Sequence, residues 1–404
     1  MSTLFFYFLF LVLTADGLMV FLTSVVVYML TGSIEYAGLS YAIWWLPRLI
    51  LIPLIGRLID NIGVRPLSII SDCIKIAGCL FLVACNFHDP LIISIAFGIV
   101  GSLVSIGNSQ TMIAYEKIIA ILSKHKEHHV NLMSRMDFLG MIIGPVVGML
   151  LIDMGYKYIL SLPCLFYSLN AGYFIFTNAN LDNKEMNGIS RSNLGTVDKK
   201  SRFHSLGFIM STPIILVVIG LATGNNMFDG LVESSGAALI DRNMELPVKY
   251  FGFIDVAAGI FGVLGTYIYG MALKRISRSS LLLLGLFVIV IPSFTLILNP
   301  NSIWIFVICY ALTIIGKVIT GNVNRIIRIE VIPTTILAST SSIIVLLCQS
   351  VLPIVGILLF FFGGKGSIVY YLMTFSVFIT LLSGVLLVIY MKNKVIEHTI
   401  YKDQ

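Results

Sequence analysis

Long apolar runs follow one another along the whole chain, separated by short polar turns that carry glycine, proline or charge. Most of these runs reach or exceed the roughly 20 residues that an α-helix needs to cross a bilayer. They predict twelve membrane-spanning helices, near residues 3–31, 36–59, 66–87, 90–122, 131–153, 157–178, 207–239, 250–273, 280–298, 302–324, 334–362 and 368–391. The predicted fold class is therefore an all-α polytopic membrane protein.

A polar connector divides these twelve spans into two sets of six. Pro145 in the fifth span and Pro353 in the eleventh are 208 residues apart, and a glycine follows each of them after three residues. A shared offset of this kind is typical of transporters built from structural repeats. We therefore expect an N-terminal six-helix bundle at residues 1–178, a cytoplasmic linker at 179–206, and a pseudo-symmetric C-terminal bundle with a short tail at 207–404.

Composition agrees with this pattern and excludes several classes of protein. Of the 404 residues, 58% are hydrophobic and 11% are charged, whereas soluble domains carry about 25% charged residues. The net charge of +6 lies in the predicted turns, so no basic stripe favours nucleic acid. The six cysteines lie in apolar runs without a Cys-x-x-Cys pair, so we expect no disulfide framework, no metal site and no cofactor.

The placement of positive charge orients the chain in the membrane. With both termini in the cytoplasm, the cytoplasmic turns and the C-terminal tail hold seventeen Lys and Arg residues, against four in the outer turns. Cytoplasmic loops of membrane proteins carry such an excess. The first apolar run is longer than a signal peptide and lacks a positive leader, so we interpret it as the first span.

Four polar residues interrupt the apolar runs of the first half. Asp16 lies about a third of the way through the first span, where a buried carboxylate is costly and is a functional hypothesis by default. Arg48 lies in the middle of the second span and must face a cavity or a partner such as Asp16, unless it extends to an interface. Asn108 and Gln110 add hydrogen-bonding groups to the fourth span. Asp16 either binds a proton or a cationic group, or serves as a structural hydrogen-bonding acid.

The third span begins with two opposite charges three residues apart. Asp72 and Lys75 lie on one helical face. We interpret them as a structural pair near the turn that precedes the span, and not as part of a substrate site.

The seventh predicted span is unusually polar. It carries Asn225, Asn226, Asp229 and Glu233, together with three glycines, within residues 223–236. Interrupted helices of transporters expose such oxygens to a substrate or ion. We therefore expect either a broken helix whose polar residues bind substrate or a span that ends early and places its acids in an outer loop.

The tenth and eleventh spans add two further candidates. Lys317 lies within the tenth span, where it either meets an anionic group of a substrate or neutralises Asp229 or Glu233. Gln349 adds hydrogen-bonding capacity to the eleventh span. Together with the polar residues of the first half, they are predicted to line a cavity at the middle of the bilayer.

One short turn has a recognisable motif. The stretch between the second and third spans runs from Gly56 through Arg57, Asp60 and Gly63 to Arg65. A turn this tight needs glycine at its bend, and its charges can face headgroups or the next helix terminus. The pattern Gly-x-Leu-x-Asp-x-x-Gly-x-Arg resembles the signature loop between helices 2 and 3 of the major facilitator superfamily.

Further motifs narrow the resemblance. Asp16-Gly-Leu, Leu30-Thr-Gly-Ser33, the run from Leu46 to Asp60 and Ser71-Asp72 follow one another in an order that looks like the drug:H⁺ antiporter-3 branch, which includes macrolide-efflux and siderophore-export proteins. The fifth span carries a pattern similar to the glycine-proline signature of superfamily exporters, formed by Gly144, Pro145 and Gly148. The detailed likeness covers residues 10–150, and ferroportin-like exporters share the acid in helix 1.

Charged residues at the ends of the fourth and fifth spans are a candidate gate. Glu116, Arg135 and Asp137 flank the same cytoplasmic turn, where they either close the cytoplasmic face or form solvated helix ends. The glycines Gly140, Gly144, Gly148 and Gly356 are expected to let helices approach closely.

The resemblance implies a secondary active transporter that exports a small organic compound, a drug or a siderophore, by proton antiport and rocker-switch alternating access. It also implies a monomer in the bacterial inner membrane, with protons, a small-molecule substrate and the bilayer as partners. The alternative is a ferroportin-like metal-ion exporter. A membrane-embedded enzyme is a remote alternative without a clear catalytic cluster, and an ATP-driven pump is disfavoured because no P-loop motif occurs.

Overall fold

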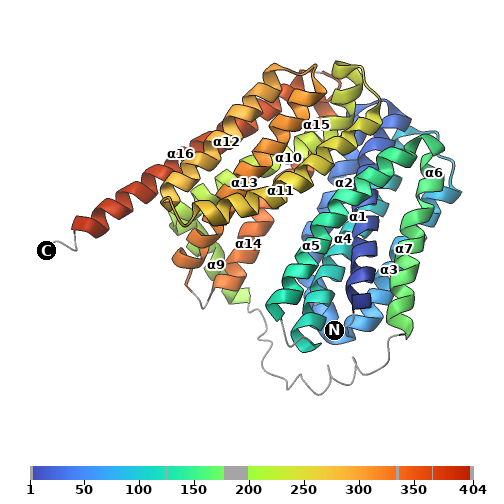
Figure 1. Cartoon of the computed structure of the whole chain (residues 1–404), viewed down its shortest axis with the longest axis horizontal. Coiled ribbons are helices and arrows are strands. Elements are labelled where there is room, and N and C mark those ends of the chain that lie inside the picture. The colour runs from blue at the N-terminus through green and yellow to red at the C-terminus, as the bar shows by residue number, and fades with distance from the viewer. Residues whose placement is uncertain (1–2, 123–125, 177–198, 334–335, 366, 401–404) are drawn as a thin grey trace. The chain divides into compact units, whose positions relative to one another are not determined.

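The computed structural model describes residues 3–122, 126–176, 199–333, 336–365 and 367–400 (Figure 1). Every regular element in these ranges is a helix. The elements are α1 (Thr3–Thr31), α2 (Ile34–Ile62), α3 (Val64–Ala84), α4 (Pro90–Leu122), α5 (Lys126–Leu151), η1 (Ile152–Met154), α6 (Tyr156–Ile159), α7 (Ser161–Phe176), α9 (Lys199–Ser211), α10 (Pro213–Met244), η2 (Val248–Phe251), α11 (Gly252–Ala272), α12 (Arg278–Leu298), α13 (Ile303–Val331), α14 (Leu337–Gln349), α15 (Val351–Phe362) and α16 (Ile368–Ile400).

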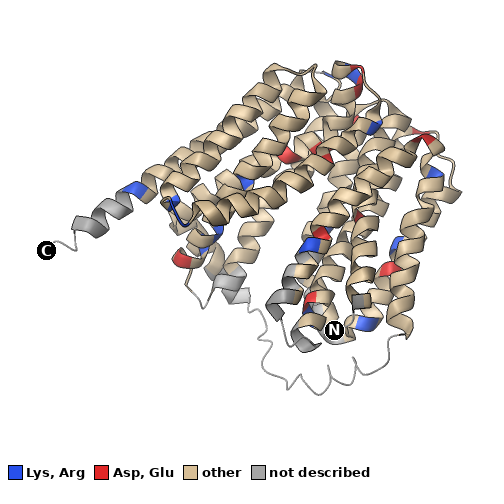
Figure 2. Ribbon diagram, viewed as in Figure 1, with Lys and Arg blue, Asp and Glu red and all other residues tan. Residues whose placement is uncertain are grey.

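The helices have the length and composition of membrane spans. Among the described residues, 11 segments are long and apolar enough to cross a bilayer, and charged residues are sparse along them (Figure 2). The second predicted span coincides with α2, which has 29 residues. The protein is an all-α, multi-pass membrane protein, as its hydrophobic pattern predicts.

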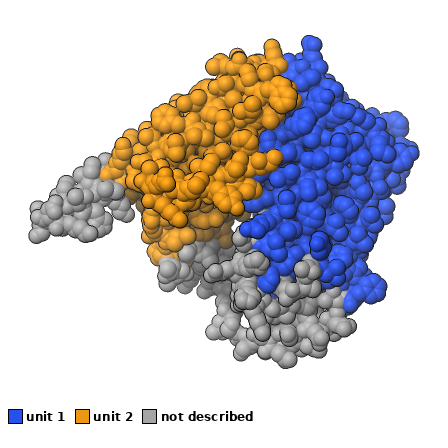
Figure 3. Space-filling model, in the orientation of Figure 1, with its two compact units in different colours: residues 1–194, 234–259, 356–364 blue, residues 195–233, 260–355, 365–404 orange. Residues whose placement is uncertain are grey.

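The chain forms two compact units (Figure 3). One unit contains residues 1–194, 234–259 and 356–364, and the other contains residues 195–233, 260–355 and 365–404. The predicted linker is partly helical, because α9 begins at Lys199, while residues 177–198 lie outside the described ranges. The boundaries predicted for the two bundles stay a prediction.

A single glycine makes the turn between α2 and α3. Gly63 has φ 95° and ψ 158°, and its N–H donates to the carbonyl of Ile59 at 3.0 Å. This left-handed φ favours glycine because a Cβ atom is strained there. The predicted glycine bend is thus confirmed at Gly63, whereas Gly56 lies within α2, which continues for six further residues. The side chains of Arg57 and Asp60 lie outside the described part of the chain.

Arg65 ties this turn to a distant helix terminus. Its Nε donates to the carbonyl of Phe174 at 2.8 Å, and its Nη2 donates to the carbonyl of Ile175 at 2.7 Å. These carbonyls belong to the last turn of α7, where they have no partner within the helix. A cation stabilises a helix C-terminus, which is the negative end of the helix dipole. The signature turn therefore fixes the end of α7.

Glycines bring α1 and α5 into backbone contact. A Cβ atom on Gly140 would lie 2.6 Å from the backbone of Leu13, and one on Gly144 would lie 2.4 Å from the Leu18 nitrogen. A Cβ atom on Gly148 would lie 2.3 Å from the Phe21 ring. Small residues at such spacing let membrane helices pack closely where hydrophobicity provides no drive. The predicted close approach at these glycines is confirmed, and Gly356 makes a similar contact with α2.

The second unit is built around α12, α13 and α16. Its core contains buried aliphatic residues from several helices, including Val218 of α10, Leu286 of α12, Ile319 of α13 and Leu387 of α16. A Cβ atom on Gly316 would lie 2.7 Å from the carbonyl oxygen of Gly285. A glycine contact thus brings α12 and α13 close together in this unit as well.

The contact between α1 and α5 predicts a clear difference between two glycine substitutions. Gly144→Ala should lower stability by about 1–3 kcal/mol, because overpacking forces the neighbouring backbone to move. Gly172→Ala, where a Cβ atom would meet nothing within 4 Å, should leave stability unchanged or raise it by up to about 1 kcal/mol. The thermal unfolding midpoints of the purified proteins in detergent measure both effects. Equal midpoints would contradict the packing described above.

Candidate functional site

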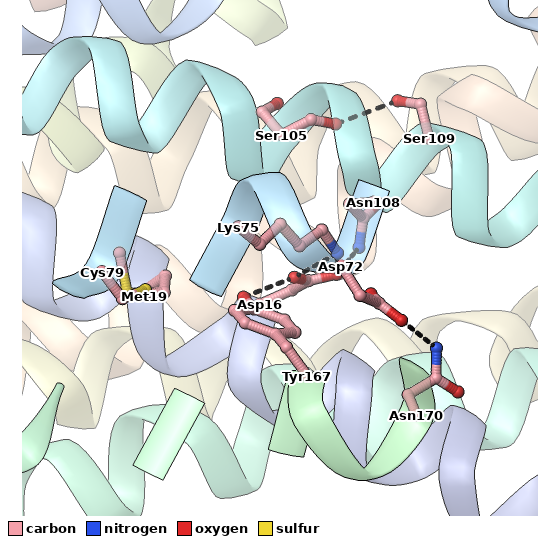
Figure 4. Close-up of polar contacts among 10 residues, drawn as sticks. All are labelled: Asp16, Met19, Asp72, Lys75, Cys79, Ser105, Asn108, Ser109, Tyr167 and Asn170. Carbon is pink, nitrogen blue, oxygen red and sulfur yellow. Dashed lines mark hydrogen bonds and ion pairs between the residues drawn. The ribbon is translucent and has the colours of Figure 1, made fainter. Parts of the chain in front are cut away.

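The candidate site of the first unit is built on a buried ion pair (Figure 4). Asp16 of α1 is 4% exposed and Lys75 of α3 is fully buried. The Lys75 Nζ atom lies 3.0 Å from Asp16 Oδ1 and 3.3 Å from Oδ2. Gly107 leaves room for this lysine, since a Cβ atom there would lie 2.2 Å from Lys75 Cε. Opposite charges in a low-dielectric interior are retained when they are paired in this way.

Two neutral groups complete the coordination of the Asp16 carboxylate. Asn108 Nδ2 of α4 donates to Oδ2 at 2.9 Å, and the Tyr167 hydroxyl of α7 donates to Oδ1 at 2.8 Å. The Lys75 ammonium also lies 4.7 Å from the centre of the Tyr167 ring, where a cation is attracted to the aromatic face. Four helices of this unit therefore supply one charged cluster, which we call the Asp16 site: Asp16, Lys75, Asn108 and Tyr167.

A second buried acid lies on the same face of α3. Asp72 Oδ2 accepts a hydrogen bond from Asn170 Nδ2 at 2.6 Å (Figure 4). Asn170 in turn accepts from the Tyr115 hydroxyl at 2.9 Å. All three residues are at most 1% exposed. Asp72 thus pairs with an amide, and the predicted structural pair between Asp72 and Lys75 is wrong because Lys75 bonds to Asp16.

The other polar residues of the first half make separate contacts. Arg48 Nη1 donates to Ser105 Oγ at 3.1 Å, and its guanidinium lies 4.9 Å from the Trp45 ring centre. Of the alternatives expected for Arg48, the pairing with Asp16 is excluded, because Lys75 occupies that position. Gln110 Nε2 donates to Ser68 Oγ at 3.0 Å, between α4 and α3.

The second unit carries its own ion pair, formed by Asp229 of α10 and Lys317 of α13. Tyr310 of α13 donates its hydroxyl to Asp229 Oδ1 at 3.1 Å. The Lys317 ammonium lies 4.9 Å from the Phe228 ring centre and 5.3 Å from that of Tyr310. The interpretation that Lys317 neutralises Asp229 is confirmed. The pair is more accessible than its counterpart, with side-chain exposures of 10% for the lysine and 25% for the acid.

The polar seventh span is one continuous helix, α10, from Pro213 to Met244. Both the expected break and the expected early end are wrong, because the polar side chains find partners on neighbouring helices. Asn225 Oδ1 accepts from Thr380 Oγ1 at 3.3 Å, and Asn226 Nδ2 donates to the Cys348 carbonyl at 2.8 Å. The first contact is helped by Gly224, whose missing side chain leaves space for Thr380. Glu233 is half-buried further along α10.

The remaining candidates are placed as follows. Glu116 and Arg135 are exposed, while Asp137 is half-buried on α5. Gln349 is half-buried at the end of α14, and Pro145 lies inside α5. The gating role of Glu116, Arg135, Asp137 and Pro145 stays a prediction, as does the place of Gln349 in a substrate-binding cavity. Within the described residues, no group of three or more His, Cys, Asp or Glu side chains is placed to hold a metal ion.

Sequence reasoning missed Lys75 and Tyr167 as members of the site. The available signal for Lys75 was charge balance, since a lysine eleven residues into a membrane-spanning helix needs an anion as surely as Asp16 needs a cation. No comparable signal marked Tyr167, because the chain has 17 tyrosines and several of them lie within apolar runs. Only the packing of α7 against α1 and α3 brings its hydroxyl to Asp16.

Breaking the buried pair should cost far more than breaking an exposed one. Lys75→Met leaves the Asp16 carboxylate without its ammonium, so we expect a loss of about 3–5 kcal/mol. The double variant Asp16→Asn/Lys75→Met should lose less than Lys75→Met alone. Arg278→Met is the matched control, because Arg278 and Glu330 pair with side chains 46% and 54% exposed and contribute about 1 kcal/mol or less.

Thermal unfolding of the four purified proteins in detergent measures these differences. Equal unfolding midpoints for Lys75→Met and Arg278→Met would contradict the predicted contribution of the Asp16–Lys75 ion pair to stability.

Solved structures of other transporters resemble nearly the whole chain. A bacterial homologue of the iron transporter ferroportin, in an inward-facing state, is 20% identical, with a TM-score of 0.69 over 96% of this chain and 99% of that chain. The nucleoside transporter NupG is 10% identical, with a TM-score of 0.73 over 95% and 98%. A D-xylose-proton symporter is 17% identical, with a TM-score of 0.70 over 96% and 97%. At these identities the likeness establishes a common fold.

The family follows from the sequence match. No curated protein sequence matched the chain. The model of the Major Facilitator Superfamily, however, matches residues 4–356, which is most of the 404-residue chain. The chain belongs to the major facilitator superfamily of membrane transporters.

Proposed function

We propose that this transporter exports a small organic compound, a drug or a siderophore, in exchange for protons. Membership of the superfamily makes the chain a transporter rather than an enzyme. The finer assignment is supported by residues 10–150, whose motifs resemble the drug:H⁺ antiporter-3 branch. In this proposal the chain is a monomer in a bacterial inner membrane with both termini in the cytoplasm, as the excess of cytoplasmic positive charge indicates.

The Asp16 site is the observation that carries the proposal. Within the described residues, Asp16 and Lys75 form a charged pair that is buried inside membrane-spanning helices. A proton on Asp16 removes the negative charge opposite Lys75, and an unpaired ammonium in a low-dielectric interior costs several kcal/mol. Protonation therefore favours a conformation in which Lys75 meets water or another anion. A transporter that changes conformation in this way couples proton binding to alternating access.

The pair formed by Asp229 and Lys317 supports a second polar position for substrate. Its side chains are partly exposed and are framed by the rings of Phe228 and Tyr310. A flat organic molecule with a charged group can bind to such a combination of aromatic faces and opposite charges. Asn226, one turn away on α10, adds an amide.

Metal-ion export is the second candidate function. It is supported by the structural likeness to the bacterial homologue of the iron transporter ferroportin and by the acid in the first helix. In this alternative Asp16 would bind the metal ion as a hard oxygen ligand after release of Lys75.

Transport into proteoliposomes under an imposed pH gradient tests the proposal. The wild-type protein should move at least one member of a panel of dyes, macrolides and carboxylate siderophores, and the rate should fall to background when the gradient is collapsed. Asp16→Asn/Lys75→Gln, which removes both charges and leaves no ion unpaired, should abolish the response to the gradient. Arg278→Gln, outside the site, should retain it.

The same liposomes distinguish the two candidate functions. Accumulation of a divalent metal ion, with no organic compound transported, would favour metal export. Equal transport with and without a gradient, or full gradient-driven transport by the double variant, would contradict proton coupling at Asp16. Monodisperse elution of each purified variant establishes that it is folded.

A further inference from the structure

Asp72 is a buried acid to which the proposed function assigns no role. It is 1% exposed, and its Oδ2 accepts one hydrogen bond from Asn170. Its other oxygen, Oδ1, is buried and has no hydrogen-bond partner among the described residues. Figure 4 shows the side chain directed at Asn170, while Lys75, one turn along the same helix, is directed at Asp16.

The balance of charges around Asp72 determines whether its carboxyl group is protonated. Asp16 and Asp72 supply two carboxyl groups, but among the described residues Lys75 is the single buried cation bonded to either of them. Lys75 is held by Asp16 through two contacts of 3.0 and 3.3 Å and by the Tyr167 ring. An ionised Asp72 would therefore be a buried carboxylate with one neutral donor and one bare oxygen. A carboxylate in such surroundings is far costlier than the neutral acid.

We propose that Asp72 is a proton-binding site, and that in this structure it carries the single proton shared by the two buried carboxyl groups around Lys75. Asp16 is then the anion of the pair, and the cluster is electrically neutral. The proposal deepens the proposed function by naming a carrier of the transported proton, but the protonation of Asp72 does not depend on what is transported.

Other titratable groups near Asp72 are consistent with a shared proton. They come from its own helix and from the helices around it: Lys75 of α3, Asp16 of α1, Tyr115 of α4 and Tyr167 of α7. The two tyrosines are fully buried and donate their hydroxyls to Asn170 and Asp16. Lys75 thus remains the cation for which both carboxyl groups compete.

Exchange of Lys75 between the two acids gives the site its transport role. Asp72 and Lys75 are three residues apart on α3 and lie on one face of the helix. When Asp72 releases its proton to water, Lys75 can turn to the new carboxylate, and Asp16 is freed to bind a proton or a cationic group. One proton leaves Asp72, one positive charge binds at Asp16, and the charge of the cluster is conserved.

Infrared spectroscopy of the purified protein in lipid nanodiscs tests the protonation directly. A protonated carboxyl group has a C=O stretching band that ionised carboxylates lack and that shifts in D₂O. At neutral pH, Asp72→Asn should remove one component of this band. The matched control Asp229→Asn, at the pair in the second unit, should retain it. An unchanged band in Asp72→Asn would overturn the proposal.

Two further variants keep the test decisive if Asp72→Asn does not fold. Lys75→Met should increase the band to about twice its Asp72 component, because Asp16 then loses its counter-ion and is protonated as well. Asn170→Ala removes the one donor that stabilises an ionised Asp72, so the band should persist to higher pH than in the wild type. A band that is unchanged in Lys75→Met, or that disappears at lower pH in Asn170→Ala, would contradict a proton on Asp72.

The transport role has a separate readout. Asp72→Asn should still exchange the transported compound across liposomes at equilibrium but should not concentrate it under a pH gradient. Intact gradient-driven transport in Asp72→Asn would remove Asp72 from the coupling even if the infrared result held. The infrared measurement uses no substrate and no gradient, so failure of the proposed export function would leave it unaffected.

Discussion

The attraction between the Asp16 carboxylate and the Lys75 ammonium is the interaction on which the first unit depends. Each ion alone would cost several kcal/mol in the interior of a membrane protein. Together they bind, and the donors Asn108 and Tyr167 satisfy the remaining acceptor positions. Because its four side chains come from α1, α3, α4 and α7, the Asp16 site fixes the rotation of each of these helices about its own axis. Apolar packing alone does not do this, since lipid is as apolar as the helix surfaces.

The second unit also contains an acid–lysine ion pair, but its side chains are more exposed. Asp229 also lies on a predicted first helix of a six-helix set, and it also meets a lysine and a tyrosine hydroxyl. Here both partners come from one helix, α13, seven residues apart, so the pair joins two helices and not four. It therefore constrains the unit less than the Asp16 site does. Its partial exposure makes it the better candidate for contact with substrate, and the enclosed cluster of Asp16, Lys75 and Asp72 is the better candidate for a proton.

Sequence alone predicted which segments are helices better than which of their residues meet. Hydropathy located the spans because length and apolar character are sufficient for that purpose, and Gly63 marked the bend because the turn needs a left-handed φ. The partner of Asp16 was missed because Lys75 lies 59 residues away, and spans that are apolar on all sides do not show which face turns inward. The polar run of α10 suggested a broken helix, although side-chain partners on other helices satisfy it.

The pattern of polar residues on α3 shows how the inward face of a membrane helix can be found from sequence. Its buried positions include Ser68, Asp72, Lys75 and Cys79, separated by four, three and four residues, which is the spacing of a single helical face. Polar groups on that face must be satisfied by neighbouring helices, so the face has to turn inward. The stripe carries one acid and one base, while α1 adds a second acid. In our proposal a proton neutralises the surplus of one negative charge, and its binding is coupled to the conformation that admits it.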